Sequence, residues 1–307
     1  MKGILPLFLA LFILLPGFSL AQSFFAVRHQ RSLMLTAGTG SSTYYGELSN
    51  PGTLLKLQPN LNVGLQIFVS PRISVRTELN WFQLKGSDAE ANDQGRKMRG
   101  LSFLSNCFEI SGTGAINLFA NGNRYYRRPT LNIYGFAGIG LLYFNPTAKL
   151  NGTSYSLEPL QTEGVSYSRI VPVIPFGLGA RLKVGPNTNI VFEGGYRKTF
   201  TDYLDDVSTK YIDPNSISDP TARYFANPNN PAYNTLTTIP PGEVNNYTTG
   251  YKRGNPSATD SYFLLNVKVE YYLPIGSSGG RRGNGLLGNK KRSSTYRYNK
   301  RGGMKRK

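Results

Sequence analysis

The sequence is poor in the side chains that most catalytic and metal sites use, and it is short of acids. Its 307 residues include one Cys and one His, and 17 acidic residues stand against 35 Lys and Arg, for a net charge of +18. A single Cys forms no intrachain disulfide, and one Cys with one His does not complete a structural zinc site. His29 precedes the first strand-like segment and Cys107 lies within another, with no second His to act as a base. We therefore predict a protein that is not an enzyme and holds no cofactor.

Long apolar runs are also absent beyond the amino terminus. A basic start, an uncharged apolar stretch over 3–18 and small residues before Gln22 are typical of a cleaved signal peptide. The stretch is short and interrupted by Pro6 and Pro16, which favours a signal over a membrane anchor. We assign residues 1–21 to a signal peptide. The mature chain is then exported, so nucleic acid is not an expected partner despite the positive charge.

What is present is alternation of polar and apolar residues with a period of two. In the clearest segment, 262–273, Val267 and Val269 share one face while Lys268 and Glu270 share the other. Successive side chains of a strand point to opposite sides, so such a segment can meet lipid on one face and a polar interior on the other. Eight segments show this pattern, at about 32–45, 59–69, 72–85, 100–119, 130–144, 170–184, 188–201 and 259–273.

The connections between these segments alternate between short and long. Short turns stand at 70–71, near 121–123 and at 185–187, and long connections at 46–58, 86–99, 145–169 and 202–258. Outer-membrane barrels combine an even strand number with short periplasmic turns and long outer loops. The sequence therefore predicts an all-β, eight-stranded antiparallel outer-membrane β-barrel over 22–276, with both termini periplasmic. A secreted β-sandwich also alternates, but the aromatic-rich outward face and the loop rhythm favour the barrel.

Charged residues recur at the inward positions of the predicted strands. There are five bases and four acids: Arg76, Glu78, Glu109, Arg181, Lys183, Glu193, Arg197, Lys268 and Glu270. An eight-stranded barrel is just wide enough for side chains to fill, and charges removed from water persist when they are paired. We predict an internal ion-pair network that plugs the barrel. The alternative is a selective pore lining.

The loop sequences carry a family resemblance. They read STYYGEL at 42–48, RGLSF at 99–103, FNP at 144–146, TEG at 162–164, FTDYLDDVS at 200–208, RGN at 253–255 and DSY at 260–262. In this order they resemble the outer-membrane barrel component of the type IX protein secretion apparatus (PorG-like family). The motif residues singled out are Tyr45, Gly46, Glu47, Thr162, Glu163, Gly164, Asp202, Tyr203, Asp205, Asp206, Arg253, Gly254, Asn255 and Asp260.

The resemblance implies a non-catalytic role in the outer membrane. Members of that family contact outer-membrane lipids and a periplasmic ring built from a lipoprotein and its peptidoglycan-linked partner. The machine exports proteins with a C-terminal sorting domain and, in some bacteria, supports gliding motility. Two other functions stay open: a stand-alone small barrel that binds an envelope ligand, and a lipid-modifying enzyme, against which the lack of a suitable His counts.

The aspartate-rich motif suggests a specific contact. We expect Asp202, Asp205 and Asp206 to pair with Arg253 or nearby bases and so fasten the segment 202–258 over the barrel mouth. An exposed acidic turn without a fixed partner is the alternative. These aspartates are also candidate calcium ligands, although their spacing is not that of an EF-hand loop.

The positive charge is concentrated in a carboxyl-terminal tail, 277–307. Its eleven bases are Arg281, Arg282, Lys290, Lys291, Arg292, Arg297, Lys300, Arg301, Lys305, Arg306 and Lys307. Without the signal and this tail, 23 bases and 17 acids leave a charge of +6. The tail is expected to be flexible and periplasmic and to seek anionic partners there. A merely solubilising tail is the alternative.

Overall fold

The computed structural model describes residues 33–49, 58–122 and 127–273. The predicted signal peptide and basic tail lie outside these residues and stay predictions. The strands are β1 (Leu33–Tyr45), β2 (Gln58–Phe68), β3 (Ile73–Ser87), β4 (Ser102–Asn117), β5 (Leu131–Leu150), β6 (Thr153–Ser156), β7 (Ile170–Lys183), β8 (Thr188–Thr199) and β9 (Ser261–Leu273). The helices are η1 (Asp88–Glu90), α2 (Gln94–Arg99), η2 (Glu158–Leu160), η3 (Pro214–Ser216) and α3 (Pro220–Ala226). No helix in the described ranges is long and apolar enough to cross a bilayer.

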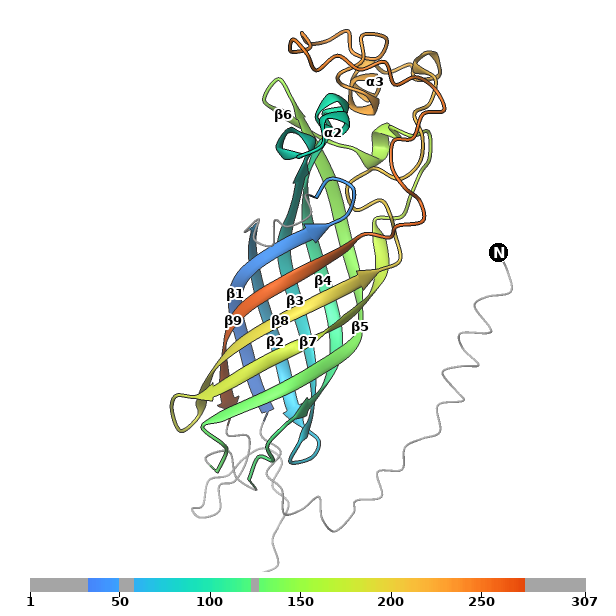
Figure 1. The fold of residues 1–307 in the computed structure, drawn as a ribbon. Helices are drawn as coiled ribbons and strands as arrows, with labels where there is room; N and C mark the ends of the chain where they lie inside the picture. The colour runs from blue at the N-terminus through green and yellow to red at the C-terminus, as the bar shows by residue number, and fades with distance from the viewer. Residues whose placement is uncertain (1–32, 50–57, 123–126, 274–307) are drawn as a thin grey trace, which may run out of the picture. The chain divides into compact units, whose positions relative to one another are not determined.

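Eight strands close into an antiparallel barrel (Figure 1). Each barrel strand pairs with its neighbours in the chain, and β1 pairs with β9 along its whole length, from Leu33 opposite Leu273 to Tyr45 opposite Ser261. Closure leaves no barrel strand with an unpaired edge, which is the condition for placing a sheet in hydrocarbon. The prediction of a closed eight-stranded antiparallel barrel is confirmed.

The two faces of the barrel wall differ as the alternation predicts. On β9, Val267 is 44% exposed and Val269 is 50% exposed on the outside, while Lys268 and Glu270 are each 1% exposed inside. The same division holds on β2, where Leu65 is exposed and Gln66 is buried. An apolar exterior around a polar interior is the arrangement of a membrane-spanning barrel.

The barrel interior is filled by an ion-pair network centred on Glu193. Arg76 donates to this carboxylate through Nη1 at 2.6 Å and Nη2 at 3.0 Å, and Lys268 Nζ donates at 2.7 Å. Tyr134 Oη donates to it as well, at 2.6 Å. Lys268 and Arg76 also pair with Glu78, so two bases share two acids. Each buried charge is thereby compensated, as burial requires.

Two further pairs extend the network along the barrel. Arg181 binds Glu270 through two hydrogen bonds of 2.6 and 2.9 Å. Arg197 lies 3.7 Å from Glu109, which accepts a 2.6 Å hydrogen bond from Tyr262 Oη. Of the nine charges predicted to face inward, eight are buried and Lys183, the last residue of β7, is half-buried. The predicted internal network is confirmed.

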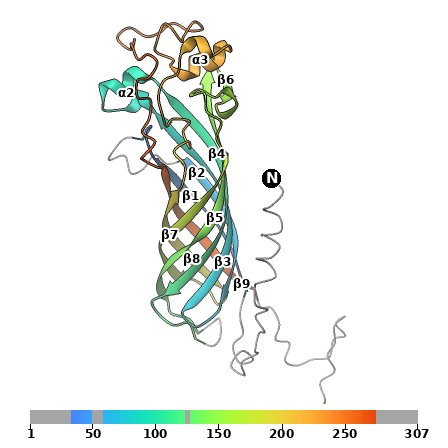
Figure 2. The same ribbon diagram turned by 90° about the vertical axis from the view of Figure 1, so that its right-hand side faces the viewer.

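The long connections carry structure that the alternation does not predict. β5 runs six residues beyond its expected end and forms a hairpin with β6 through Asn151 and Gly152, whose φ angles are 50° and 83°. Two short helices begin at aspartate caps, where Asp93 accepts from the Arg96 amide and Asp219 from the Thr221 amide. We call the described connections at this end, 46–49, 88–101, 151–169 and 200–260, the cap (Figures 1 and 2).

Replacing Glu193 by Ala tests how far the barrel depends on its interior network. The change leaves Arg76 and Lys268 to share Glu78, so we expect the free energy of unfolding to fall by about 3–5 kcal/mol. Urea unfolding in detergent micelles measures it, and Glu243→Ala, at an exposed position in the cap, is the control. A Glu193→Ala protein as stable as the control protein would contradict this account.

Candidate functional site

The candidate site lies where three neighbouring strands meet the cap. β9 lies between β1 and β8 in the barrel. At the cap end, β1 finishes at Tyr45, β8 at Thr199, and β9 begins at Ser261. The motif residues that follow β1 are therefore brought together with those that follow β8 and those that precede β9, although the first group lies more than 150 residues earlier in the chain. Eight of the fourteen motif residues predicted from the sequence are buried, either at this junction or within the cap.

Tyr44 links two buried acids at the centre of the junction. Its Oη lies 2.7 Å from Asp205 Oδ2 and 2.7 Å from Asp260 Oδ1. A phenol has one proton to donate, so the two acids either share this proton or one carboxyl group is itself protonated and donates to the phenol oxygen. Burial and neighbouring acids raise the pKa values of both Asp205 and Asp260 well above the usual range. The raised pKa values favour a proton on one of the two carboxyl groups.

Gly46 is required by this contact. A Cβ at this position would lie 1.9 Å from Tyr44 Oη and 2.0 Å from Asp260 Oδ1. The next residue, Glu47, accepts a 2.9 Å hydrogen bond from the Asn255 amide. The Gly-Glu pair of the first motif thus joins the end of β1 to the segment that precedes β9.

Arg253 is the main cation of the cap, but its chief acidic partner is not one of the three aspartates. Its Nη1 donates to Glu163 Oε1 at 2.8 Å, whereas Asp206 Oδ2 lies 3.8 Å from Nη2. Nη1 also donates to the Asp206 carbonyl at 2.5 Å. The expected pairing is therefore wrong for Asp202 and Asp205 and only weakly met by Asp206. Although burial acts in the opposite direction, Arg253 and donated hydrogen bonds lower the pKa of Glu163.

Glu163 and Asp206 fasten the third outer connection to the fourth. Glu163 accepts hydrogen bonds from the Ser208 amide at 3.0 Å and the Thr209 amide at 2.9 Å. Asp206 accepts from Thr162 Oγ1 at 2.6 Å and Tyr167 Oη at 2.7 Å. Burial raises the pKa of Asp206 to about 6, despite the nearby Arg253 guanidinium.

The motif glycines and aromatics have local structural roles. Gly164 has a φ of +69°, and a Cβ on Gly254 would meet the Ser208 backbone at 2.7 Å. Tyr203 stacks on Tyr167 with ring centroids 4.6 Å apart. Tyr45, by contrast, is half-buried and stacks on Tyr196 of β8, at 6.4 Å. Tyr45 does not take part in the contacts between carboxyl groups.

Three residues that the sequence analysis did not single out complete the site. They are Tyr44, Asp88 and Arg99. Arg99 donates two hydrogen bonds to the Asp88 carboxylate, from Nε at 2.7 Å and from Nη2 at 2.9 Å. Its Nη1 donates to the Arg253 carbonyl at 2.6 Å. The alternation of the first strand could have identified Tyr44. Only one of two consecutive strand residues faces inward, and here it is Tyr44 and not Tyr45. No sequence signal identifies Asp88.

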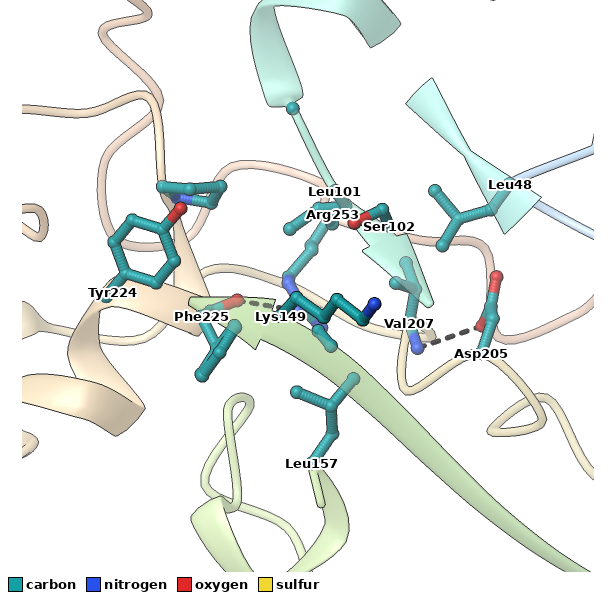
Figure 3. Close-up of a pocket in the computed structure, with 13 residues that line it drawn as sticks. Leu48, Leu101, Ser102, Lys149, Leu157, Asp205, Val207, Tyr224, Phe225 and Arg253 are labelled. Atoms are coloured by element: carbon teal, nitrogen blue, oxygen red, sulfur yellow. Dashed lines mark hydrogen bonds between the residues drawn. The ribbon is translucent and has the colours of Figure 1, made fainter. Parts of the chain in front are cut away.

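The cavity between the second, third and fourth outer connections is small. One cavity of about 40 Å³ is lined by apolar side chains, including Leu101, Leu157 and Phe225, with Asp205 and Arg253 at its wall (Figure 3). Binding pockets for small molecules usually measure about 300–1,000 Å³. This cavity is therefore a packing gap and not a substrate pocket.

Three carboxylates have the arrangement needed to share a cation. Glu47, Asp202 and Asp260 each place an oxygen within 4.8 Å of the others. Burial and, to a smaller extent, the negative charge of Glu47 raise the pKa of Asp202 to about 7. The Ser208 side chain, as a nearby hydrogen-bond donor, acts in the opposite direction. Burial also raises the pKa of Glu47.

Comparison with known proteins places the chain in a family. Residues 18–236 match the family described as "Domain of unknown function (DUF6089)". No curated protein sequence matches the chain.

Solved structures similar to this one are small outer-membrane barrels. The N-terminal β-barrel domain of Pseudomonas aeruginosa OprF is 7% identical, covering 79% of this chain and 98% of that chain, with a TM-score of 0.36. Neisserial surface protein A is 9% identical, covering 78% of this chain and 97% of that chain, with a TM-score of 0.39. A major outer membrane protein from Thermus thermophilus is 13% identical, covering 80% of this chain and 100% of that chain, with a TM-score of 0.37. The fold assignment rests on the strand pairing of this chain itself.

Replacing Gly46 by Ala tests whether the cap depends on the contact between Tyr44 and Asp260. The added Cβ forces these groups apart, and we expect the cap to lose about 1–3 kcal/mol of stability while the barrel stays folded. Limited proteolysis within 200–260 measures the opening of the cap. Gly112→Ala, which adds a methyl group in open space on β4, is the control. Equal cleavage rates in the two variants would show that the contact does not hold the cap.

Proposed function

We propose a function for this chain, which belongs to the DUF6089 family: a non-catalytic outer-membrane barrel component of the type IX protein secretion apparatus. The family description leaves the function open. One observation carries the proposal. The loop motifs on which the secretion-system resemblance rests are far apart in the sequence, but their residues contact one another where the cap meets the barrel.

The filled interior supports a structural role over transport through the barrel. Arg76, Lys268 and Glu193 meet inside the barrel at hydrogen-bonding distance, and Arg181 pairs with Glu270 nearer the end that lacks the cap. A pore would have to separate these pairs in a space that excludes bulk water, which is costly. A barrel of this kind serves as an anchor.

The chemistry of the described residues also favours a non-catalytic role. The only cysteine, Cys107, is fully buried on β4, and the described ranges contain no histidine. Nucleophilic catalysis of the Ser–His or Cys–His kind therefore has no candidate base in this part of the chain.

The proposed partners lie at the end of the barrel opposite the cap. Both Leu33 and Leu273, where the described barrel begins and ends, lie at that end together with the turn 184–187. We propose that this end faces the periplasm and that the basic tail 277–307 binds the ring lipoprotein or its peptidoglycan-linked partner. The tail itself lies outside the described residues.

Crosslinking and capture of the full-length chain from detergent-solubilised membranes tests the proposal. We expect ring subunits to be captured with the wild-type chain. Fewer should be captured with a variant in which the eleven tail bases are replaced by Gln, because the attraction to anionic partners is removed. Loss of the chain should abolish export of proteins with a C-terminal sorting domain and leave envelope lipids unchanged.

Capture of no ring subunits, with the barrel folded and in the outer membrane, would refute the proposal. Altered envelope lipids with normal export would instead favour an enzyme. The alternative of a stand-alone ligand-binding barrel would place its ligand in the open groove of about 700 Å³ in the cap, which Lys210, Tyr211 and Lys252 help to line.

A further inference from the structure

Three acidic side chains at the junction of barrel and cap come from different parts of the chain. Glu47 follows β1, Asp202 follows β8 and Asp260 immediately precedes β9. Because β1, β9 and β8 are neighbours in the barrel, their ends place these carboxylates side by side, with oxygens within 4.8 Å of one another. Like charges this close repel unless a proton or a cation lies between them.

Asp202 is an exception among the buried acids of the cap. It is 7% exposed, and neither of its carboxylate oxygens accepts a hydrogen bond of standard geometry in the described part of the chain. The Ser208 hydroxyl is the one side-chain donor close enough to lower its pKa, and it carries no charge. Glu47 Oε2 is buried and unpartnered in the same way. An ionised carboxylate buried without a partner is strongly disfavoured, so these oxygens indicate a missing positive partner.

The two buried arginines of the cap, Arg99 and Arg253, do not supply that partner. Arg99 is held by Asp88 through two hydrogen bonds, and Arg253 is held by Glu163. In the described part of the chain, neither guanidinium forms an ion pair with Glu47, Asp202 or Asp260 at 4.0 Å or less.

The other oxygens of the cluster are fixed in place by the fold. Glu47 Oε1 accepts from the Asn255 amide at 2.9 Å, and Asp260 Oδ2 accepts from the Leu204 amide at 3.0 Å. Such second contacts orient carboxylates and leave their remaining lone pairs to a metal ion. The geometry is that of a partly built ligand set, which water molecules can complete.

We propose that Glu47, Asp202 and Asp260 form a calcium site that joins the end of β1, the segment after β8 and the start of β9. Oxygen-only ligands select hard cations over zinc or copper. Ca²⁺ binds oxygens at about 2.3–2.6 Å, so two of its ligands can lie up to about 5 Å apart, and it accepts irregular geometry. Mg²⁺ requires a tighter, near-octahedral arrangement.

This assignment differs from the candidate set in the sequence. Of the three aspartates in the motif, only Asp202 belongs to the site. Asp205 and Asp206 do not belong to the group of carboxylate oxygens that lie within 4.8 Å of one another. Asp206 instead accepts from Thr162 and Tyr167. The site does not depend on the proposed secretion function, since it needs only the folded cap.

Calcium binding is tested with the full-length barrel, folded in detergent and freed of divalent ions with a chelator. Calorimetric titration with CaCl₂ should show one site, with a Kd in the range of about 10⁻⁵–10⁻³ M. Titration with MgCl₂ should show binding at least tenfold weaker. Saturating calcium should also slow proteolysis of the segment 202–258 in the wild-type chain.

The informative variant is Asp202→Asn, which keeps the shape of the side chain and removes its charge. It should bind calcium at least tenfold more weakly and lose the protection from protease. Asp213→Asn, at an exposed aspartate in the same connection, should behave as the wild-type chain. A heat-modifiability gel shift checks that each barrel is folded.

Three outcomes would overturn the proposal. They are the absence of a calcium signal in the folded wild-type chain, equal affinity in the Asp202→Asn variant, and equal loss of affinity in the Asp213→Asn variant. If the Asp202→Asn barrel does not fold, terbium luminescence sensitised by tyrosine in the wild-type chain replaces it as the readout. Terbium emission that calcium does not quench by competition would then count against the site.

Discussion

The structure depends on the ion pairs that Glu193 makes with Arg76 and Lys268 inside the barrel. A sheet in hydrocarbon must close so that its backbone groups are satisfied, and closing eight strands creates an interior too narrow for bulk water. Polar side chains on the inner face must then satisfy one another. Glu193 accepts hydrogen bonds from Arg76, Lys268 and Tyr134. One buried carboxylate on β8 thus provides a partner for donors on β3, β9 and β5. The apolar exterior and the filled interior both follow from this constraint.

The cap is held by the same kind of interaction, but with an excess of acids. Arg253 and Arg99 bind Glu163 and Asp88, and they tie the second, third and fourth outer connections together. Among the described residues, the acids Glu47, Asp202 and Asp260 at the ends of β1, β8 and β9 form no ion pair with either guanidinium group. There a tyrosine, a shared proton and the proposed calcium ion take the place of guanidinium groups. The stability of the junction between barrel and cap is therefore expected to depend on calcium.

The barrel could be predicted from the sequence more completely than the site. Alternation with period two identified all eight barrel strands and the inward charges, because it records directly which face each side chain takes. β6 is not predicted by the alternation, because the four-residue strand lies within the segment 145–169, which reads as one long connection. Asn151-Gly152 is nevertheless a strong hairpin signal. The motif residues were found, but their partners were not. Whether Arg253 meets Glu163 or Asp205 depends on how distant loops pack, and spacing in the chain does not record that.

The central claim is that the barrel is a closed structural element and not a conduit. Conductance of the folded wild-type chain in planar lipid bilayers tests it most directly. Because paired charges fill the interior, the account predicts no stable channel openings at any salt concentration that leaves the barrel folded. Uniform, persistent conductance steps from the wild-type protein would contradict it.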